Sequence, residues 1–282
     1  MTRQKRREGY RDERGAEPGK EWNEKRKSRR RRNRRKARIR FLASMLGTLL
    51  GAVLLVLVAY TALNLFCGFG KVNTQKLREQ GYPESLIALV ERNPETKDFV
   101  LDYPKYKGLE EIDISKEVTK GEIPHFLQWD ERWGYENYGS DFLAVTGCGP
   151  TSLSMVVCGL TGDTKWNPYE VAKMAEDNGY YVDGSGSSWE LMSSGAEKLG
   201  LTVSSVIFDA EHIRATLEAG QPIICVMGPG DFTDAGHFLV LTGVDQEGDI
   251  ILQDPNSVER TKQHWDVQKL MNQMKNLWSY RV

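Results

Sequence analysis

The chain has 282 residues and a formal net charge of −1, with 40% hydrophobic residues, 27 glycines, 10 prolines and four cysteines. This composition supplies enough apolar material for an ordinary core, and it excludes a collagen-like chain and a disulfide-rich scaffold. The near-neutral total conceals a division. Residues 1–40 carry 19 basic and 6 acidic side chains (+13), whereas the other 242 residues carry 19 basic and 33 acidic (−14). Because one globular fold does not require such a division, we expect at least two physically different parts.

Residues 1–40 form a basic tail, which we predict to be disordered because it is polar and highly charged. Its most basic stretch runs from Lys25 to Arg40 (KRKSRRRRNRRKARIR). Taken alone, such a run suggests nucleic-acid binding or nuclear targeting. Its position beside an apolar segment favours a different interpretation, in which the basic side chains stay on the cytoplasmic side of a membrane and contact anionic lipid headgroups. We therefore predict no nucleic-acid partner.

Residues 41–66 (FLASMLGTLLGAVLLVLVAYTALNLF) contain no charged side chain over 26 positions. As a helix they would be about 39 Å long, which is enough to cross a hydrocarbon core of about 30 Å. A buried core helix would show a polar face, and a cleavable signal peptide has a short leader and an apolar stretch of about 7–15 residues. We predict an uncleaved signal anchor that spans the cell membrane once, with residues 1–40 in the cytoplasm and the chain after Phe66 outside, as in a Gram-positive bacterium.

Residues 67–120 are predicted to be an extracellular linker with one short helix. Pro83 suits the first turn of that helix, and Asn93 followed by Pro94 ends it. Residues 99–103 have the pattern of a docking strand or an extended segment. The whole stretch is either a spacer with contacts of its own or a flank of the following domain. The apolar stripe of the short helix consists of Leu86, Ile87, Leu89 and Val90.

Residues 121–282 have the texture of one globular domain. Helices come first and strands mostly follow, which favours an α+β fold. Ser187 and Glu190 are spaced as a capping box for the third of the predicted helices. The apolar patterns predict helices at 149–160, 168–178, 188–199, 210–219 and 265–275, and strands at 201–208, 222–227, 237–244, 249–253 and 277–282.

The densest chemical signal is the segment 146–152, TGCGPTS, which leads into an apolar helical pattern. Pro150 in the first turn places Cys148 at the N-terminus of that helix, where the helix dipole and free backbone N–H groups favour an anion. The flanking glycines leave room for a substrate backbone. We interpret Cys148 as a nucleophilic thiolate, and the alternative is a small core residue, which free cysteines often are.

Two further cysteines lack such a setting. Cys158 lies ten positions along the same helix and faces another direction, and Cys225 lies within an apolar strand. Neither forms a CxxC pair, so we predict no metal site and no cofactor. A disulfide between these two residues stays an alternative to two buried thiols.

A nucleophilic cysteine needs a base, and His237 stands at the start of the apolar run 237–244. A lone strand histidine can also be an ordinary core or rim residue. Asp254 directly follows the strand 249–253. If these two strands pair as a hairpin around residues 246–248, their far ends meet and bring His237 beside Asp254. The carboxylate would then fix the imidazole tautomer and leave one nitrogen for Cys148.

These residues resemble a known family. The motifs GCGPTS at 147–152, GHFLVLTG at 236–243 and the pair Asp254-Pro255 are similar to cysteine-peptidase family thirty-nine, the bacteriocin-leader peptidase-like group of the papain-like superfamily. LQWDERWG at 127–134 is similar to the opening of its stand-alone members. The resemblance covers about residues 121–282. It implies a papain-like α+β fold with Cys148 as nucleophile, His237 as general base and acid, and Asp254 as the orienting residue.

The chain departs from the leader-processing members at one position. They carry an oxyanion-hole glutamine six residues before the cysteine, where this chain has Phe142. Gln128 is the candidate replacement, together with the backbone N–H of Cys148, and the alternative for Gln128 is a structural or solvated amide. Losing one such donor typically lowers the rate by about 10²–10³. Since no nucleotide-binding motif accompanies the unit, a double-glycine leader is not the expected substrate.

Three functions are compatible with these residues. The first is a membrane-anchored extracellular cysteine peptidase that hydrolyses peptide or isopeptide bonds in a peptide or cell-wall peptide substrate. The second passes the acyl group to an amine, as a transpeptidase or amidase does. The third is a non-catalytic module that binds peptides or wall polymers, which an intact set of Cys148, His237 and Asp254 disfavours. We take the first as the prediction.

Overall fold

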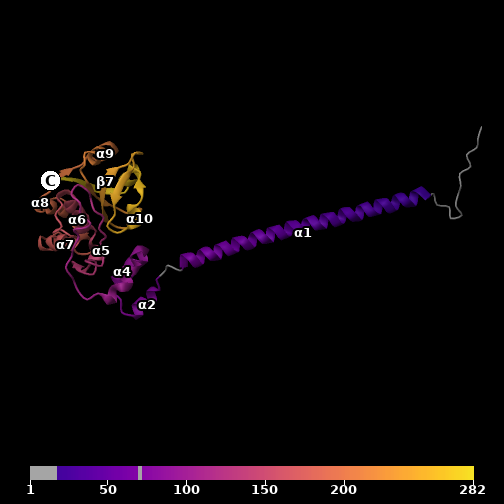
Figure 1. Ribbon diagram of the computed structural model, residues 1–282, viewed down its shortest axis with the longest axis horizontal. Coiled ribbons are helices and arrows are strands. Elements are labelled where there is room, and N and C mark those ends of the chain that lie inside the picture. The colour runs from indigo at the N-terminus through magenta and orange to yellow at the C-terminus, as the bar shows by residue number, and fades with distance from the viewer. Residues whose placement is uncertain (1–17, 69–71) are drawn as a thin grey trace, which may run out of the picture. The chain divides into compact units, whose positions relative to one another are not determined.

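The structure is a computed structural model that describes residues 18–68 and 72–282. The chain divides after Lys71 into two compact units, which are described separately below (Figure 1). The part of the predicted basic tail before Pro18 lies outside the described residues, and so does the join at 69–71.

The first unit contains one uninterrupted helix, α1 (Pro18–Gly68), drawn in indigo and purple in Figure 1. It includes the predicted span 41–66. Among the described residues it is the one helix that is long and apolar enough to cross a membrane. The prediction of disorder is wrong for residues 18–40, which are helical. Arginine, lysine, glutamate and alanine are good helix formers, and extending an existing helix requires no new nucleation.

The second unit begins with a series of short helices: α2 (Thr74–Glu79), α3 (Glu84–Arg92), η1 (Pro94–Thr96), α4 (Lys97–Asp102) and η2 (Tyr103–Lys105). The predicted short helix is confirmed as α3, with its apolar stripe buried and its end at Asn93. The prediction of an extended segment at 99–103 is wrong. Thr96, Phe99 and Val100 are buried and lie at helical spacing, so the period of burial outweighs the strand preference of the aromatic and β-branched residues.

The prediction that residues 67–120 form a linker is also wrong for the described part of this stretch, because the helices pack onto the globular domain. The ring of Phe99 stacks on the ring of Tyr135 at a centroid distance of 4.2 Å, and the Tyr135 hydroxyl donates to the Phe99 carbonyl at 2.6 Å. Residues 72–282 are therefore one body. The shared apolar cluster consists of Leu77, Leu86, Ile87, Leu89, Val90, Phe99, Val100, Tyr135 and Ala144.

A six-stranded antiparallel sheet forms the centre of this unit. Its strand order is β5-β10-β6-β7-β8-β9, and each predicted strand is present. The domain is therefore a mixed helix and sheet fold, as predicted. The strands are β5 (Thr202–Ser205), β6 (Ile223–Met227), β7 (His237–Val244), β8 (Ile250–Gln253), β9 (His264–Trp265) and β10 (Met274–Arg281).

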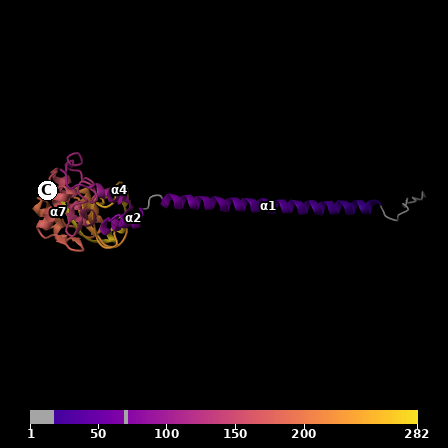
Figure 2. The same ribbon diagram turned by 90° about the horizontal axis from the view of Figure 1, so that it is seen from below.

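The remaining elements are helices and two small hairpins. In both views α2 and α4 lie together, on the side of the unit away from α7 (Figures 1 and 2). The helices are α5 (Leu143–Thr146), α6 (Cys148–Thr161), α7 (Pro168–Asp177), η3 (Trp189–Met192), α8 (Ser194–Lys198), α9 (Ala210–Glu218), α10 (Val258–Thr261) and α11 (Val267–Met271). The hairpins pair β1 (Asn137–Tyr138) with β2 (Asp141–Phe142) and β3 (Tyr181–Val182) with β4 (Gly186–Ser187).

Two predicted helices are shorter in the structure. The helix expected at 188–199 is divided into η3 and α8 at Ser193. The predicted capping box is wrong, because Ser187 lies in β4 and its hydroxyl pairs with the Tyr138 hydroxyl at 2.8 Å. The helix expected at 265–275 is reduced to α11, since Trp265 belongs to β9 and Met274 begins β10.

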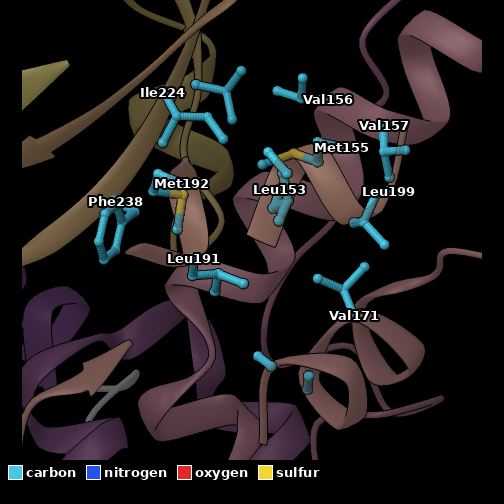
Figure 3. Packing of buried hydrophobic residues seen from close by; sticks show 14 of the residues in the cluster. Leu153, Met155, Val156, Val157, Val171, Leu191, Met192, Leu199, Ile224 and Phe238 are labelled. Carbon is cyan, nitrogen blue, oxygen red and sulfur yellow. The ribbon is translucent and has the colours of Figure 1, made fainter. Parts of the chain in front are cut away.

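The core has two halves, one on each face of the sheet, and β7 contributes side chains to both. Phe238 and Val240 face the half that contains α6, whereas Leu239 and Leu241 face the other half. Figure 3 shows Leu153 and Met155 of α6 packed among residues of the sheet and of η3. Because α6 is buried along most of its length, its N-terminus is held firmly near the start of β7.

Candidate active site

A cleft of about 320 Å³ opens where the N-terminus of α6 meets the start of β7. Three of the four predicted site residues line it: Gln128, Cys148 and His237. The fourth, Asp254, is fully buried and hydrogen-bonds with His237. The other lining residues are Leu89, Arg92, Asn93, Val145, residues 230–236, Asn256 and Arg260.

Cys148 is the first residue of α6, as the sequence predicted, and Pro150 lies in the first turn. Gly149 is required by packing, because a Cβ atom at this position would lie 2.4 Å from the Ser187 hydroxyl. Burial alone would raise the pKa of the Cys148 thiol. Hydrogen bonding to His237, the charge of His237 and the backbone N–H groups of Phe238 and Gly149 outweigh this effect, so the pKa is lowered.

Cys158 and Cys225 are buried free thiols, so the alternative of a disulfide between them is wrong. Burial raises the pKa of each thiol to about 12. The Cys158 thiol donates to the Trp166 carbonyl at 3.3 Å. Among Cys148, Cys158 and Cys225, Cys148 is therefore the one whose surroundings favour the thiolate.

His237 and Asp254 meet because β7 and β8 pair as the sequence predicted. The two strands are antiparallel, with Val240 opposite Gln253, so the start of β7 lies beside the residue that follows β8. His237 Nε2 lies 2.7 Å from Asp254 Oδ1. Burial alone would lower the pKa of His237, but the carboxylate of Asp254 and the thiol of Cys148 outweigh it, so the pKa is raised. With Nε2 bound to Asp254, Nδ1 is the imidazole nitrogen left for Cys148.

Asp254 has partners for both carboxylate oxygens. Oδ1 also accepts from the backbone N–H of Asn256 at 2.8 Å, and Oδ2 accepts from Nε of Arg260. Burial alone would raise the pKa of this carboxyl, but His237 and Arg260 outweigh it, and the pKa is lowered. A buried carboxylate between two cationic partners stays ionised.

Arg260 and His125 both contact Asp254, and no motif in the sequence marks either residue. The Arg260 side chain forms an ion pair with its carboxylate, and His125 Nε2 lies 2.8 Å from its backbone carbonyl oxygen. Arg260 lies in a short polar helix and His125 in a loop, so neither has an apolar period to mark it. The one sequence feature that relates Arg260 to Asp254 is their separation of six residues, and this spacing is too common to predict a contact.

Gln128 lies in the cleft with 3% of its surface exposed. Its Nε2 donates to the Ala144 carbonyl at 2.7 Å, and its backbone N–H donates to the Pro255 carbonyl at 2.7 Å. An amide NH₂ has two hydrogens, so one remains for a further acceptor. Phe142, at the position of the oxyanion glutamine in leader-processing peptidases, ends β2 and packs edge-on against Tyr103.

Within residues 18–68 and 72–282, no three His, Cys, Asp or Glu side chains gather closely enough to hold a metal ion. The side chains that line the cleft include the thiol of Cys148, the imidazole of His237 and the amides of Asn93, Gln128 and Asn256.

Comparison with known proteins identifies the family of the chain. The model of the Peptidase C39-like family matches residues 120–282, so the chain belongs to this family. This membership confirms the resemblance found in the sequence, and it suggests a cysteine peptidase. A protein from Bacillus anthracis assigned to the C39-like peptidases, known from a crystal structure, is 19% identical, with coverage of 58% of this chain and 97% of its own and a TM-score of 0.34. No curated protein matches the chain.

Proposed function

We propose that the protein is a membrane-anchored cysteine peptidase that hydrolyses peptide or isopeptide bonds outside the cell, with a papain-like arrangement of Cys148, His237 and Asp254. The observation that carries this proposal is the place of His237: it lines the same cleft as Cys148 at the start of α6, and its Nε2 lies 2.7 Å from the buried carboxylate of Asp254. The lowered pKa of the thiol and the raised pKa of the imidazole favour a thiolate–imidazolium pair.

In this proposal the Cys148 thiolate attacks the carbonyl carbon of the substrate and forms a tetrahedral adduct. The backbone N–H of Cys148 and the free amide hydrogen of Gln128 donate to its oxyanion. The His237 imidazolium gives its proton to the leaving amine as the C–N bond breaks, which leaves an acyl-thioester on Cys148. His237, now neutral, takes a proton from water, and the resulting attack releases the acid and the thiolate. Asp254 holds the imidazole in position throughout and moves no proton.

A peptidyl electrophile tests the nucleophile directly. We expect a peptide acyloxymethyl ketone to modify Cys148 and to leave Cys158 and Cys225 unmodified in the folded protein. The surroundings of Cys148 favour its thiolate, whereas both other thiols are buried with a raised pKa of about 12. Mass spectrometry of the digested protein locates the adduct, and Cys148→Ala is the control that should stay unlabelled.

Equal labelling of the three cysteines, or none, would remove the basis for a nucleophile at Cys148. Labelling without turnover of any peptide would favour the binding module. Transfer of the acyl group to an added amine in preference to water would favour a transpeptidase.

The anchoring part of the proposal rests on α1. The helix contains the apolar stretch 41–66, and the basic stretch from Lys25 to Arg40 precedes it. Basic residues beside a span are retained on the cytoplasmic side and interact with anionic headgroups. The globular unit that begins at Val72 would then lie outside the cell, where a peptide or cell-wall peptide substrate is available.

Protease treatment of intact cells tests this topology. We expect the treatment to remove peptides from residues 72–282 and to spare those from residues 1–40, because only the chain beyond the span is exposed. Mass spectrometry before and after treatment measures both groups, and lysed cells serve as the control in which both should be lost. Protection of the C-terminal peptides in intact cells would reverse the proposed orientation.

A further inference from the structure

The segment that precedes the family match forms one wall of the active-site cleft. The match begins at residue 120, but Leu89, Arg92 and Asn93 line the same cleft as Cys148 and His237. These residues come from the C-terminal end of α3 and the residue that follows it. The segment therefore contributes to the site, although the family motifs do not include it.

Asn93 connects this wall to the loop that carries Asp254. Its side chain is 8% exposed, and Nδ2 donates to the backbone carbonyl of Asn256 at 2.6 Å and to Asn256 Oδ1 at 3.1 Å. The backbone N–H of the same Asn256 donates to Asp254 Oδ1 at 2.8 Å. One residue therefore separates Asn93 from the carboxylate that holds His237.

Glu95 makes a second connection to the Asp254 carboxylate, which reaches the other oxygen, Oδ2, through α10 and Arg260. Its Oε1 accepts from the Ser257 hydroxyl, and its Oε2 accepts from the backbone N–H groups of Val258 at 2.8 Å and Glu259 at 3.3 Å. These N–H groups begin α10, and the first N–H groups of a helix have no partner within it. Arg260 follows directly and donates from Nε to Asp254 Oδ2.

We propose that Asn93 and Glu95 are positioning residues of the active site, which hold the loop 254–260 so that Asp254 keeps His237 in line with Cys148. This inference rests on the proposed function. A helix of four residues such as α10 has little stability of its own, so its place depends on the groups that hold its ends. Without the Glu95 carboxylate, the first N–H groups of α10 lose their acceptor. The helix is then held by the Ser257 hydroxyl, which accepts from the Arg260 N–H at 3.0 Å, and by Trp265 Nε1, which donates to the Arg260 carbonyl at 3.1 Å. Arg260 is therefore held less firmly against Asp254 Oδ2.

The test compares the reactivity of Cys148 in four full-length proteins in detergent: wild type, Glu95→Ala, Glu95→Gln and Glu91→Ala. Glu91 is the matched control, since it is 45% exposed and its carboxylate pairs with Arg78 at 3.4 Å, away from the loop. The rate of iodoacetamide alkylation at Cys148 is measured by mass spectrometry from pH 5 to pH 10. Urea unfolding of each variant measures stability separately.

We expect Glu95→Ala to alkylate about tenfold more slowly than wild type near neutral pH, with its pH profile displaced towards that of an ordinary thiol, since small misplacements at a reacting centre have effects of this size or larger. Glu95→Gln keeps one acceptor oxygen and should fall between the two. Glu91→Ala should coincide with wild type. A role in stability alone would lower the urea midpoint and leave the alkylation profile of the folded protein unchanged.

Asn93→Asp is the second variant, in case Glu95→Ala does not fold. It keeps the oxygen that accepts from the Glu95 N–H at 3.1 Å, but it replaces the Nδ2 donor with an oxygen that faces two oxygens of Asn256. We expect the same displacement of the profile. If the alkylation profile of the wild type has its inflection at the pKa of an ordinary thiol, both the proposed function and this inference are excluded. A depressed wild-type profile that folded Glu95→Ala and Asn93→Asp both reproduce would remove this inference alone.

Discussion

Replacing His237 with alanine should make alkylation of Cys148 at pH 6.5 about tenfold slower. An ordinary thiol with a pKa of about 8.5 is only about 1% thiolate at that pH. The imidazole lowers the pKa of the Cys148 thiol, so the wild type should hold far more thiolate. A thiolate with a lower pKa is also a weaker nucleophile, by about half a logarithmic unit for each pKa unit, and this offsets part of the gain.

The pH profile of hydrolysis should have the form of a bell, and its two limbs follow from the direction of each shift. Activity requires the thiolate together with the imidazolium. It should therefore rise as the pH passes the lowered pKa of Cys148 and fall as the pH passes the raised pKa of His237. Because the two groups are coupled, the inflections belong to the pair. His237→Ala should lose both the bell and the early rise.

Alkylation rates of wild type and His237→Ala from pH 4 to pH 10 measure how far the imidazole lowers the pKa of the Cys148 thiol. The backbone N–H groups of Phe238 and Gly149 also lower the pKa of the thiol, and the substitution leaves them in place, so a small depression of the pKa should remain in the variant. Coincident profiles would mean that the imidazole does not stabilise the thiolate, and the helix N-terminus would then be the whole cause of any depression. Cys225 provides an internal control, because it is buried in the folded protein and should not react with the reagent.

The central contact of the site could be predicted from the sequence because it depends on short-range rules. Apolar runs bounded by turn residues predict β7 and β8, the turn between them predicts their pairing, and a single hairpin then brings His237 beside Asp254. Pro150 and the glycines around Cys148 similarly identified the start of α6. Each of these steps requires only neighbouring elements and the period of one strand or helix.

The contacts that support this centre could not be predicted, because they join distant polar residues. Asn93 and Asn256 are 163 positions apart, and no apolar pattern points from one to the other. The extended conformation expected at 99–103 failed for a related reason, since the burial of Phe99 is decided by its stacking on Tyr135. For the same reason the sequence predicts a linker at 67–120, although Leu89, Arg92 and Asn93 of this stretch line the cleft.

Arg260 changes what can be expected of substitutions at Asp254. An asparagine at this position could still accept from His237 Nε2 and from the N–H of Asn256. Its amide group would, however, face Arg260, either placing a donor against the Nε donor or losing the charge that pairs with it. Arg260 is 24% exposed, and its Nη2 is buried without a partner among the described residues. Its guanidinium therefore depends on the Asp254 carboxylate.

Activity should fall in the order wild type, Asp254→Asn, Asp254→Ala, with Cys148→Ala inactive. Alanine removes the group that orients His237 and stabilises its charge, and we expect a loss of about 10²–10⁴ in kcat/KM, the range seen when the acid of a catalytic triad is replaced. It also leaves Arg260 without its buried partner, which typically costs about 3–5 kcal/mol of stability. The double variant Asp254→Asn with Arg260→Gln separates the loss of activity from the loss of stability, because a glutamine oxygen can accept from the new amide. Circular dichroism and urea unfolding of each variant accompany the rates on a turned-over peptide. If the double variant regains stability and its activity stays at the level of Asp254→Asn, the lost activity reflects the missing charge beside His237. A folded Asp254→Ala with the wild-type rate would mean that Asp254 only braces the turn before Pro255, and that His237 is oriented by other contacts.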